Sequence, residues 1–169
     1  MARNRASAKK AGTEFETAME SYLRWALDDP RIMRLRLHGA KDIGDIGNVF
    51  FQGEPVVIEC KNTATLNARQ HMREAIVEAG NADSPWPWVL QKKAGVGLSN
   101  IQSLGRQLAY TQVDVFDRMI VGFSTATVAA VTRDATILGR KGDIIQISVQ
   151  QFALLLNHGL PLGPDVDKS

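Results

Sequence analysis

The 169-residue sequence contains a single cysteine, so no internal disulfide is possible. Its three histidines do not stand at the spacing that a zinc site requires. Nowhere does an apolar run reach the roughly 18 residues of a membrane-spanning helix, and the first ten residues lack the apolar core of a secretion signal. We therefore expect a cytoplasmic protein without disulfides, structural zinc or a membrane span.

Acidic side chains are absent from the first ten residues, although the whole chain is nearly neutral, with a net charge of +2. Four basic residues stand in that stretch: Arg3, Arg5, Lys9 and Lys10. We expect residues 1–11 to form a flexible basic arm. Such an arm suits a polyanionic partner such as nucleic acid. The alternative is a solvated charged tail without a partner.

The composition is ordinary for a globular protein, with 44% hydrophobic and 22% charged residues. We expect one domain over residues 12–160, followed by an irregular tail over 161–169, where prolines and glycines are frequent. No internal repeat divides the chain.

Apolar residues recur at helical spacing in some segments and alternate in others. The pattern predicts helices over 13–27, 66–79 and 150–157, with Thr13 as the first helix cap. It predicts strands over 31–37, 45–52, 55–61, 86–93 and 143–149, with a hairpin turn at 53–55. Segment 94–109, rich in Gly, Ser and Gln, is expected to be a loop with a short helix, and segment 117–132 remains open between strand, hairpin and buried helix. The order predicts an α/β fold with an αβββαβ core, a mixed central sheet flanked by helices, and an extra C-terminal strand and helix.

Two acids and a lysine form the most informative pattern. Glu59 and Lys61 are two residues apart in a predicted strand, so their side chains lie on the same face. Asp45, fourteen residues before Glu59, opens the preceding strand, and the hairpin would bring the two strands together. Two carboxylates can bind a divalent metal, and a neighbouring lysine can act on a water molecule. The pattern indicates metal-dependent phosphodiester hydrolysis.

Asp42 is an alternative to Asp45, because Asp42-Ile43-Gly44 and Asp45-Ile46-Gly47 are near copies. The spacing to Glu59 and the position at the start of the strand favour Asp45. Asp42 would then assist a second metal ion or be solvated. Cys60 points away from Glu59 and is expected to be a small buried residue rather than a reactive thiol.

Four short segments together resemble the PD-(D/E)xK nuclease superfamily, most closely the archaeal-type Holliday junction resolvases and small phage-encoded relatives. The segments are Gly12-Thr13-Glu14-Phe15-Glu16, Gly44-Asp45-Ile46, Ile58-Glu59-Cys60-Lys61 and Gln70. The resemblance covers about residues 12 to 93. It departs from the family at Gly44, where the family has proline.

The resemblance implies a restriction-endonuclease-like fold and a role for each matching residue. Asp45 and Glu59 would bind Mg²⁺, which Mn²⁺ could replace, with the carbonyl of Cys60 as a third ligand. Glu16 would hold a metal-bound water or a second ion. Lys61 would position or help to deprotonate the attacking water, and Gln70 would orient water or phosphate.

The resemblance also implies a DNA endonuclease that cuts branched DNA and leaves 5′-phosphate and 3′-hydroxyl ends. Such an enzyme would serve DNA recombination or repair, as a homodimer, in a bacterial or phage-infected cell. Lys92 and Lys93, together with the basic residues of the arm, are candidate contacts to the DNA backbone. The alternatives are another nuclease of the superfamily, whether nicking, restriction-type or exonuclease, and a DNA-binding module without catalysis.

Overall fold

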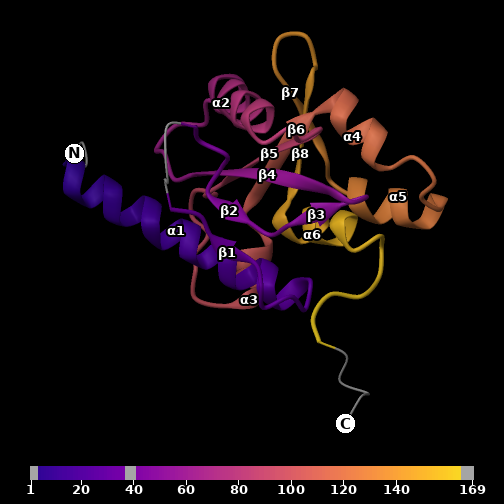
Figure 1. Cartoon of the computed structure of the whole chain (residues 1–169), viewed down its shortest axis with the longest axis horizontal. Coiled ribbons are helices and arrows are strands. Elements are labelled where there is room, and N and C mark those ends of the chain that lie inside the picture. The colour runs from indigo at the N-terminus through magenta and orange to yellow at the C-terminus, as the bar shows by residue number, and fades with distance from the viewer. Residues whose placement is uncertain (1–3, 37–40, 165–169) are drawn as a thin grey trace.

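The computed structural model describes residues 4–36 and 41–164 and has an α/β fold (Figure 1). The described residues form eight strands: β1 (Met33–Arg34), β2 (Ile46–Gly47), β3 (Phe50–Phe51), β4 (Glu54–Lys61), β5 (Trp86–Gln91), β6 (Leu108–Gln112), β7 (Thr136–Leu138) and β8 (Ile144–Ser148). They also form six helices: α1 (Arg5–Ala26), α2 (Ala68–Asn81), α3 (Ile101–Gly105), α4 (Val113–Met119), α5 (Thr125–Thr132) and α6 (Val149–Leu156).

The strands form one open mixed sheet in the order β1-β2-β4-β5-β6-β8-β7, with β3 paired to β4 outside this path. Strands β4 and β5 are parallel, and α2 makes the crossover between them, whereas the other pairs are antiparallel. Lys61 pairs with Gln91, so β4 and β5 end at the same edge of the sheet. The predicted α/β fold with a mixed sheet and flanking helices is confirmed.

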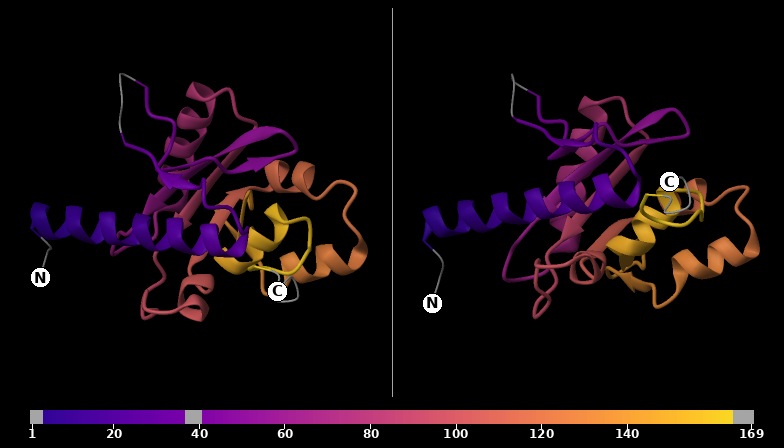
Figure 2. Two further views of the ribbon diagram at one scale, coloured as in Figure 1. Left: turned by 60° about the horizontal axis from the view of Figure 1, so that its bottom comes forward. Right: turned by 90° about the horizontal axis from the view of Figure 1, so that it is seen from below.

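Helices cover both faces of the sheet (Figures 1 and 2). Alternate residues of β4 and β5, among them Ile58 and Trp88, join α1 and α6 in the larger apolar core. The opposite face packs against α2, where Met72 and Ala75 contact Val89 and Tyr110. Glu59 and Lys61 alternate with Ile58 and Cys60, so they lie on the α2 side. Within the described residues, no helix is both long and apolar enough to cross a membrane.

The first helix begins at Arg5, eight residues before the predicted cap at Thr13. Asn4 is the N-cap, and its Oδ1 accepts a hydrogen bond from the Ser7 backbone N–H at 2.8 Å. Alanine, lysine and arginine are strong helix formers, and they extend the helix through the basic stretch. The expectation of a flexible arm is therefore wrong for residues 5–11. Arg3 lies outside the described residues.

The predicted strand over 45–52 is split into β2 and β3 at Asn48, which has a positive φ of 62°. The Asn48 side-chain amide donates to the carbonyl of Arg31 at 2.8 Å and holds this break in place. The hairpin turn consists of Gln52 and Gly53, both with positive φ, rather than residues 53–55. Two such residues are typical of a type I′ turn. As a result, β2 pairs with the C-terminal half of β4 and β3 with its beginning.

The remaining differences concern the ends of the chain and the open segments. The predicted strand over 31–37 shrinks to β1, and residue 37 lies outside the described residues. Segment 94–109 contains α3, and segment 117–132 is mainly helical. Residues 161–164 are irregular, as expected, and the Gly163 N–H donates to the carbonyl of Ala26 at 2.9 Å. The rest of the predicted tail, 165–169, is outside the described residues.

Candidate active site

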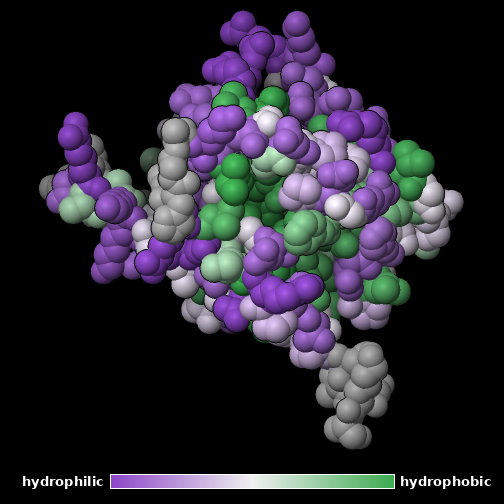
Figure 3. Space-filling model, in the orientation of Figure 1, coloured by the Kyte–Doolittle hydropathy of each residue, from purple (hydrophilic) through white to green (hydrophobic). Residues whose placement is uncertain are grey.

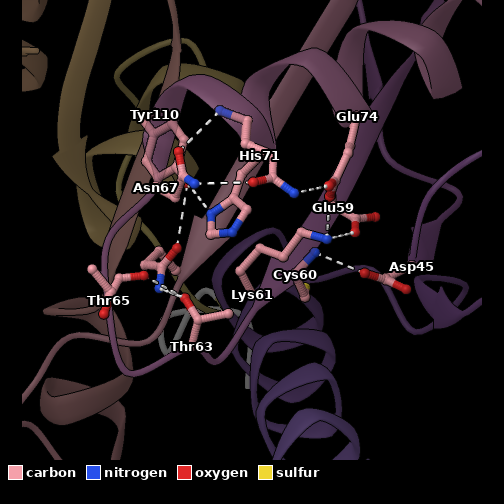
Figure 4. A network of polar contacts seen from close by, with 12 residues as sticks. Asp45, Glu59, Cys60, Lys61, Thr63, Thr65, Asn67, His71, Glu74 and Tyr110 are labelled. Atoms are coloured by element: carbon pink, nitrogen blue, oxygen red, sulfur yellow. Dashed lines mark hydrogen bonds and ion pairs between the residues drawn. The ribbon is translucent and has the colours of Figure 1, made fainter. Parts of the chain in front are cut away.

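The antiparallel pairing of β2 with β4 brings Asp45 beside Glu59. Ile46 pairs with Ile58, so the next residues outward are Asp45 and Glu59. The Asp45 N–H donates to the Ile58 carbonyl at 2.8 Å, and Asp45 Oδ2 accepts from the Cys60 N–H at 2.7 Å. The backbone bond holds Asp45 beside β4, and the bond from Cys60, drawn in Figure 4, fixes its carboxylate at the C-terminal half of that strand.

Burial and negative charge act together on Asp45. Desolvation, followed by the charge of Glu59, raises the pKa of the Asp45 carboxyl above its ordinary value. Glu59 is only 8% exposed. Such a pair is costly when both groups are ionised, and a bound divalent cation would remove this cost.

Lys61 lies between two carboxylates on the same face of the sheet. Its Nζ is 2.6 Å from Glu59 Oε1 and 2.5 Å from Glu74 Oε2 on α2. Burial alone would lower the pKa of Lys61, but the hydrogen bonds to Glu59 and Glu74 outweigh burial and raise this pKa. The lysine is therefore a cation at neutral pH, and in this arrangement it cannot serve as a base.

Helix α2 contributes one face to the site through residues spaced four apart: Gln70, Glu74 and Glu78. The Gln70 side-chain amide donates to Glu74 Oε1 at 3.2 Å, and Gln70 Oε1 accepts from the amide of Asn67 at 3.0 Å. Gln70 is exposed and reaches Lys61 only through Glu74. Sequence reasoning selected Gln70 and missed Glu74 and Glu78, although their spacing of four from Gln70 marks the same helical face.

Glu78 is the second acid that sequence reasoning missed. It is 7% exposed, and its Oε2 atom has no hydrogen-bond partner among the described residues. Burial, followed by the charge of Glu59, raises the pKa of Glu78 above its ordinary value. Glu78 lines a hollow beside α2, together with Asp42, Arg73, Glu74, Val77 and Asn81.

Asp42 and Asp45 have different positions. Asp42 is exposed, its Oδ1 accepts from the Gly44 N–H at 3.0 Å, and its carbonyl accepts from the side-chain amide of Asn81 at 2.7 Å. Asp42 therefore lies at the hollow, on the loop tied to α2. Asp45, not Asp42, lies opposite Glu59, because the next residue, Ile46, pairs with Ile58. This placement agrees with the preference for Asp45.

Glu16 approaches the site from α1, on the other side of the sheet. Its negative charge contributes to the raised pKa of Asp45. Its carboxylate is bound by Arg34, at 2.7 Å from Nη2 and 3.1 Å from Nε. Glu16 is thus close enough to influence the acids, but its Oε2 is occupied by an arginine.

Cys60 packs its side chain against the larger core, on the face opposite Glu59. Burial and the neighbouring acids raise the pKa of its thiol well above the ordinary value, so the thiol is neutral. The side chain is half-buried rather than fully buried as expected, and it lies on the core face of the sheet.

The donors around Asp45 suit a magnesium ion held by few protein ligands. Within residues 4–36 and 41–164, no group of three or more His, Cys, Asp and Glu side chains is arranged to hold one ion. Mg²⁺ commonly uses only one or two carboxylates and completes its octahedron with water and substrate phosphate. The Asp45 and Glu59 pair fits this pattern.

Among the basic residues that were expected to contact DNA and that the structure describes, all but Lys92 are exposed. Arg5, Lys9 and Lys10 lie on the first turns of α1, which project beyond the sheet and are largely hydrophilic (Figures 2 and 3). Lys93 is exposed. It lies at the edge where β4 ends, because the N–H of the neighbouring Lys92 donates to the Lys61 carbonyl at 2.8 Å. The Lys92 ammonium instead binds the carbonyls of Lys93 and Val96 within its own loop.

The raised pKa of Asp45 predicts a pH dependence of stability in the absence of metal. The folded state retains a proton on Asp45 at pH values where the unfolded state has lost it. The resulting stabilisation is lost as pH rises through the raised pKa. In urea unfolding with EDTA, we expect the wild type to lose stability relative to Asp45→Asn as pH rises from about 4, the pKa of an unfolded Asp, to about 7, the raised pKa of Asp45. A constant difference across that range would contradict the raised pKa.

Three comparisons with known proteins, against family models, curated proteins and solved structures, found no match for this chain.

Proposed function

We propose that the protein is a Mg²⁺-dependent DNA endonuclease, selective for branched DNA such as four-way junctions. The observation that carries this proposal is the convergence of Asp45, Glu59 and Lys61 at the C-terminal half of β4. Asp45 and Glu59 would hold the metal, with the carbonyl of Cys60 as a third ligand. When bound, Mg²⁺ would supply an activated water and stabilise charge on the phosphate oxygens.

The lysine would act as a cation. Lys61 is protonated in its contacts with Glu59 and Glu74, so its role is to attract the scissile phosphate and offset charge developing in the transition state. Glu74 orients the ammonium, and Gln70 supports Glu74 through its amide. Glu16 would contribute a remote negative charge or hold water.

The choice of branched DNA rests on the resemblance and on the distribution of basic residues. The exposed basic residues on α1 and after β5 suit contacts to phosphates, which position a protein on DNA without reading its sequence. We propose a homodimer, because cutting a junction symmetrically requires two sites.

The test is a cleavage assay with the full chain on a four-way junction, its matching linear duplex and covalently closed circular DNA, in Mg²⁺ and in EDTA. We expect Mg²⁺-dependent cleavage of the junction into products that DNA ligase can reseal, since they carry 5′-phosphate and 3′-hydroxyl ends. Equal cutting of the linear duplex would mean that the protein is a nuclease without selectivity for branched DNA. Absence of cleavage in both Mg²⁺ and Mn²⁺ would refute the proposed nuclease activity.

A DNA-binding module without catalysis is the second candidate. The observation in its favour is that Lys61 is fully engaged by Glu59 and Glu74, as a structural ion-pair network would be. Junction binding with no cleavage under any metal would select this candidate.

The N-terminal turns of α1 provide a prediction about DNA binding. Replacing Arg5, Lys9 and Lys10 by glutamine preserves helix propensity but removes three charges. We expect weaker junction binding and a shallower dependence of log K on log salt, by about 0.9 for each phosphate that the variant no longer neutralises. Fluorescence anisotropy over a salt series measures both. The control is the double variant Arg140→Gln with Lys141→Gln, which replaces two exposed basic residues in the β7–β8 turn. An unchanged slope in the α1 variant would exclude these residues from the interface.

A further inference from the structure

The first turns of α1 project beyond the rest of the fold (Figure 2). Residues 4–10 are all exposed, and none of them is acidic. The helix continues from Arg5 to Ala26, and its later turns are anchored in the core by Phe15 and Met19. Extending a helix from turns that are already formed requires no new nucleation. The anchored turns therefore determine where the projecting turns lie.

Two basic residues of the projecting turns lie on the same face of α1 as Glu16. A helix turns about 100° per residue, so Arg5 and Lys9 lie within about 20° of the direction of Glu16. Lys10 lies about 120° away, and its ammonium is 3.8 Å from Glu14 Oε1. Within residues 4–36 and 41–164, neither Arg5 nor Lys9 forms an ion pair. An anionic partner on the Glu16 face can therefore bind both.

A hydrogen bond ties the base of the projecting turns to the end of β4. The Asn62 side-chain amide donates to the carbonyl of Ala11 at 3.1 Å, and Asn62 directly follows Lys61. Further along the same helix, the charge of Glu16 acts on Asp45. The projecting turns are thus fixed relative to both the lysine and the acids of the candidate active site.

The helical rise converts the position of each basic residue into a distance from the site. At about 1.5 Å per residue, Lys9 lies about 10 Å and Arg5 about 16 Å along the helix axis from Glu16. Successive phosphates of one strand are about 3.4 Å apart along duplex DNA. The two distances therefore correspond to about three and five base pairs along a duplex that follows α1.

We propose that Arg5 and Lys9 bind two backbone phosphates on one arm of the DNA, about three and five base pairs from the phosphate that is cut. The inference rests on the proposed function, because the proposed metal centre defines which phosphate is cut. Contacts to phosphates position a protein on DNA without reading bases. This pair of contacts sets the place of the cut. Lys10, which faces another direction and contacts Glu14, takes no part.

The experiment replaces single phosphates of a four-way junction by uncharged methylphosphonates and measures binding of the full chain in Ca²⁺ by fluorescence anisotropy. Cleavage of the unmodified junction in Mg²⁺ locates the cut. We expect about 5-fold weaker binding when either of the two phosphates, about three and five positions from the cut, is neutralised. In Arg5→Gln with Lys9→Gln, both positions should lose their effect, because the cations that they contact are gone.

Lys10→Gln is the matched control, since it removes one charge from the same turns and should keep the wild-type pattern. All three replaced residues are exposed, and glutamine preserves helix propensity, so the variants keep the fold. Sensitive phosphates at other positions, or an unchanged pattern in Arg5→Gln with Lys9→Gln, would overturn the inference and leave the nuclease standing.

Failure of the proposed function has a different signature. A wild type that binds the junction but cuts nothing in Mg²⁺ or Mn²⁺ would refute the nuclease. The two contacts would still be tested, because the sensitive phosphates should lie about two positions apart, as the four residues between Arg5 and Lys9 require. A wild type that neither binds nor cuts the junction would overturn both.

Discussion

Asp45→Asn should abolish Mg²⁺-dependent cleavage, with a loss of at least about 10³-fold in rate, while junction binding in Ca²⁺ remains. A loss of this size corresponds to about 4 kcal/mol of transition-state stabilisation. The asparagine retains an oxygen that can accept the Cys60 N–H, which Asp45 Oδ2 accepts at 2.7 Å. The substitution therefore removes the charge that would bind the metal and leaves the strand pairing intact.

Asparagine is a sharper probe than alanine at this position. Alanine would also remove the hydrogen bond to Cys60, and a hydrogen bond to a charged group contributes about 2 kcal/mol to stability. The matched control is Glu54→Gln, an exposed acid at the other end of β4, which should cut like the wild type. Wild-type cleavage by Asp45→Asn would show that the metal site lies elsewhere.

Lys61→Met should reduce the rate of cleavage by about 10²-fold or more, with a smaller effect on metal affinity. Methionine retains the long apolar stem but removes the ammonium, which lies 2.6 Å from Glu59 and 2.5 Å from Glu74. Single-turnover cleavage over a Mg²⁺ series separates the rate of chemistry from the affinity for the metal. A fall in metal affinity alone, at an unchanged maximal rate, would contradict the role of Lys61 as a catalytic cation.

The loss of Lys61 also leaves two acids without their partner, so part of the effect could come from stability. Removing one member of a buried ion pair is destabilising because the remaining charge is uncompensated. The double variant Lys61→Met with Glu74→Gln relieves this charge. We expect it to recover melting temperature relative to Lys61→Met but not activity. Recovery of activity would mean that the lysine serves the fold rather than the reaction.

The N-terminal helix shows where local patterns were insufficient. A run of alanine, lysine and arginine is compatible with a solvated arm and with a helix, since these residues form helices readily but provide little apolar surface. The decision between the two rests on Asn4, which caps the helix, and on the continuation of the helix into the buried stripe at Phe15 and Met19. A cap four residues into a basic stretch is a weak signal when read alone.

The α2 acids show the same limit at the site. The spacing of Gln70, Glu74 and Glu78 places them on one helical face, but spacing does not say which face meets the sheet. The parallel crossover from β4 through α2 to β5 determines that. It turns Glu74 toward Lys61 and Glu78 toward Glu59.

The sequence alone determined the mixed α/β fold. It also determined that a hairpin brings an aspartate beside the strand that carries Glu59 and Lys61. Alternation along a strand and the turn of a hairpin are local properties, because the residues involved lie close together in the sequence. The spacing already favoured Asp45 over Asp42. Only the tertiary structure decided that Glu16 is bound to Arg34 and which α2 acids enter the site. These contacts join segments far apart in sequence, so they depend on strand register and helix placement, which no single segment specifies.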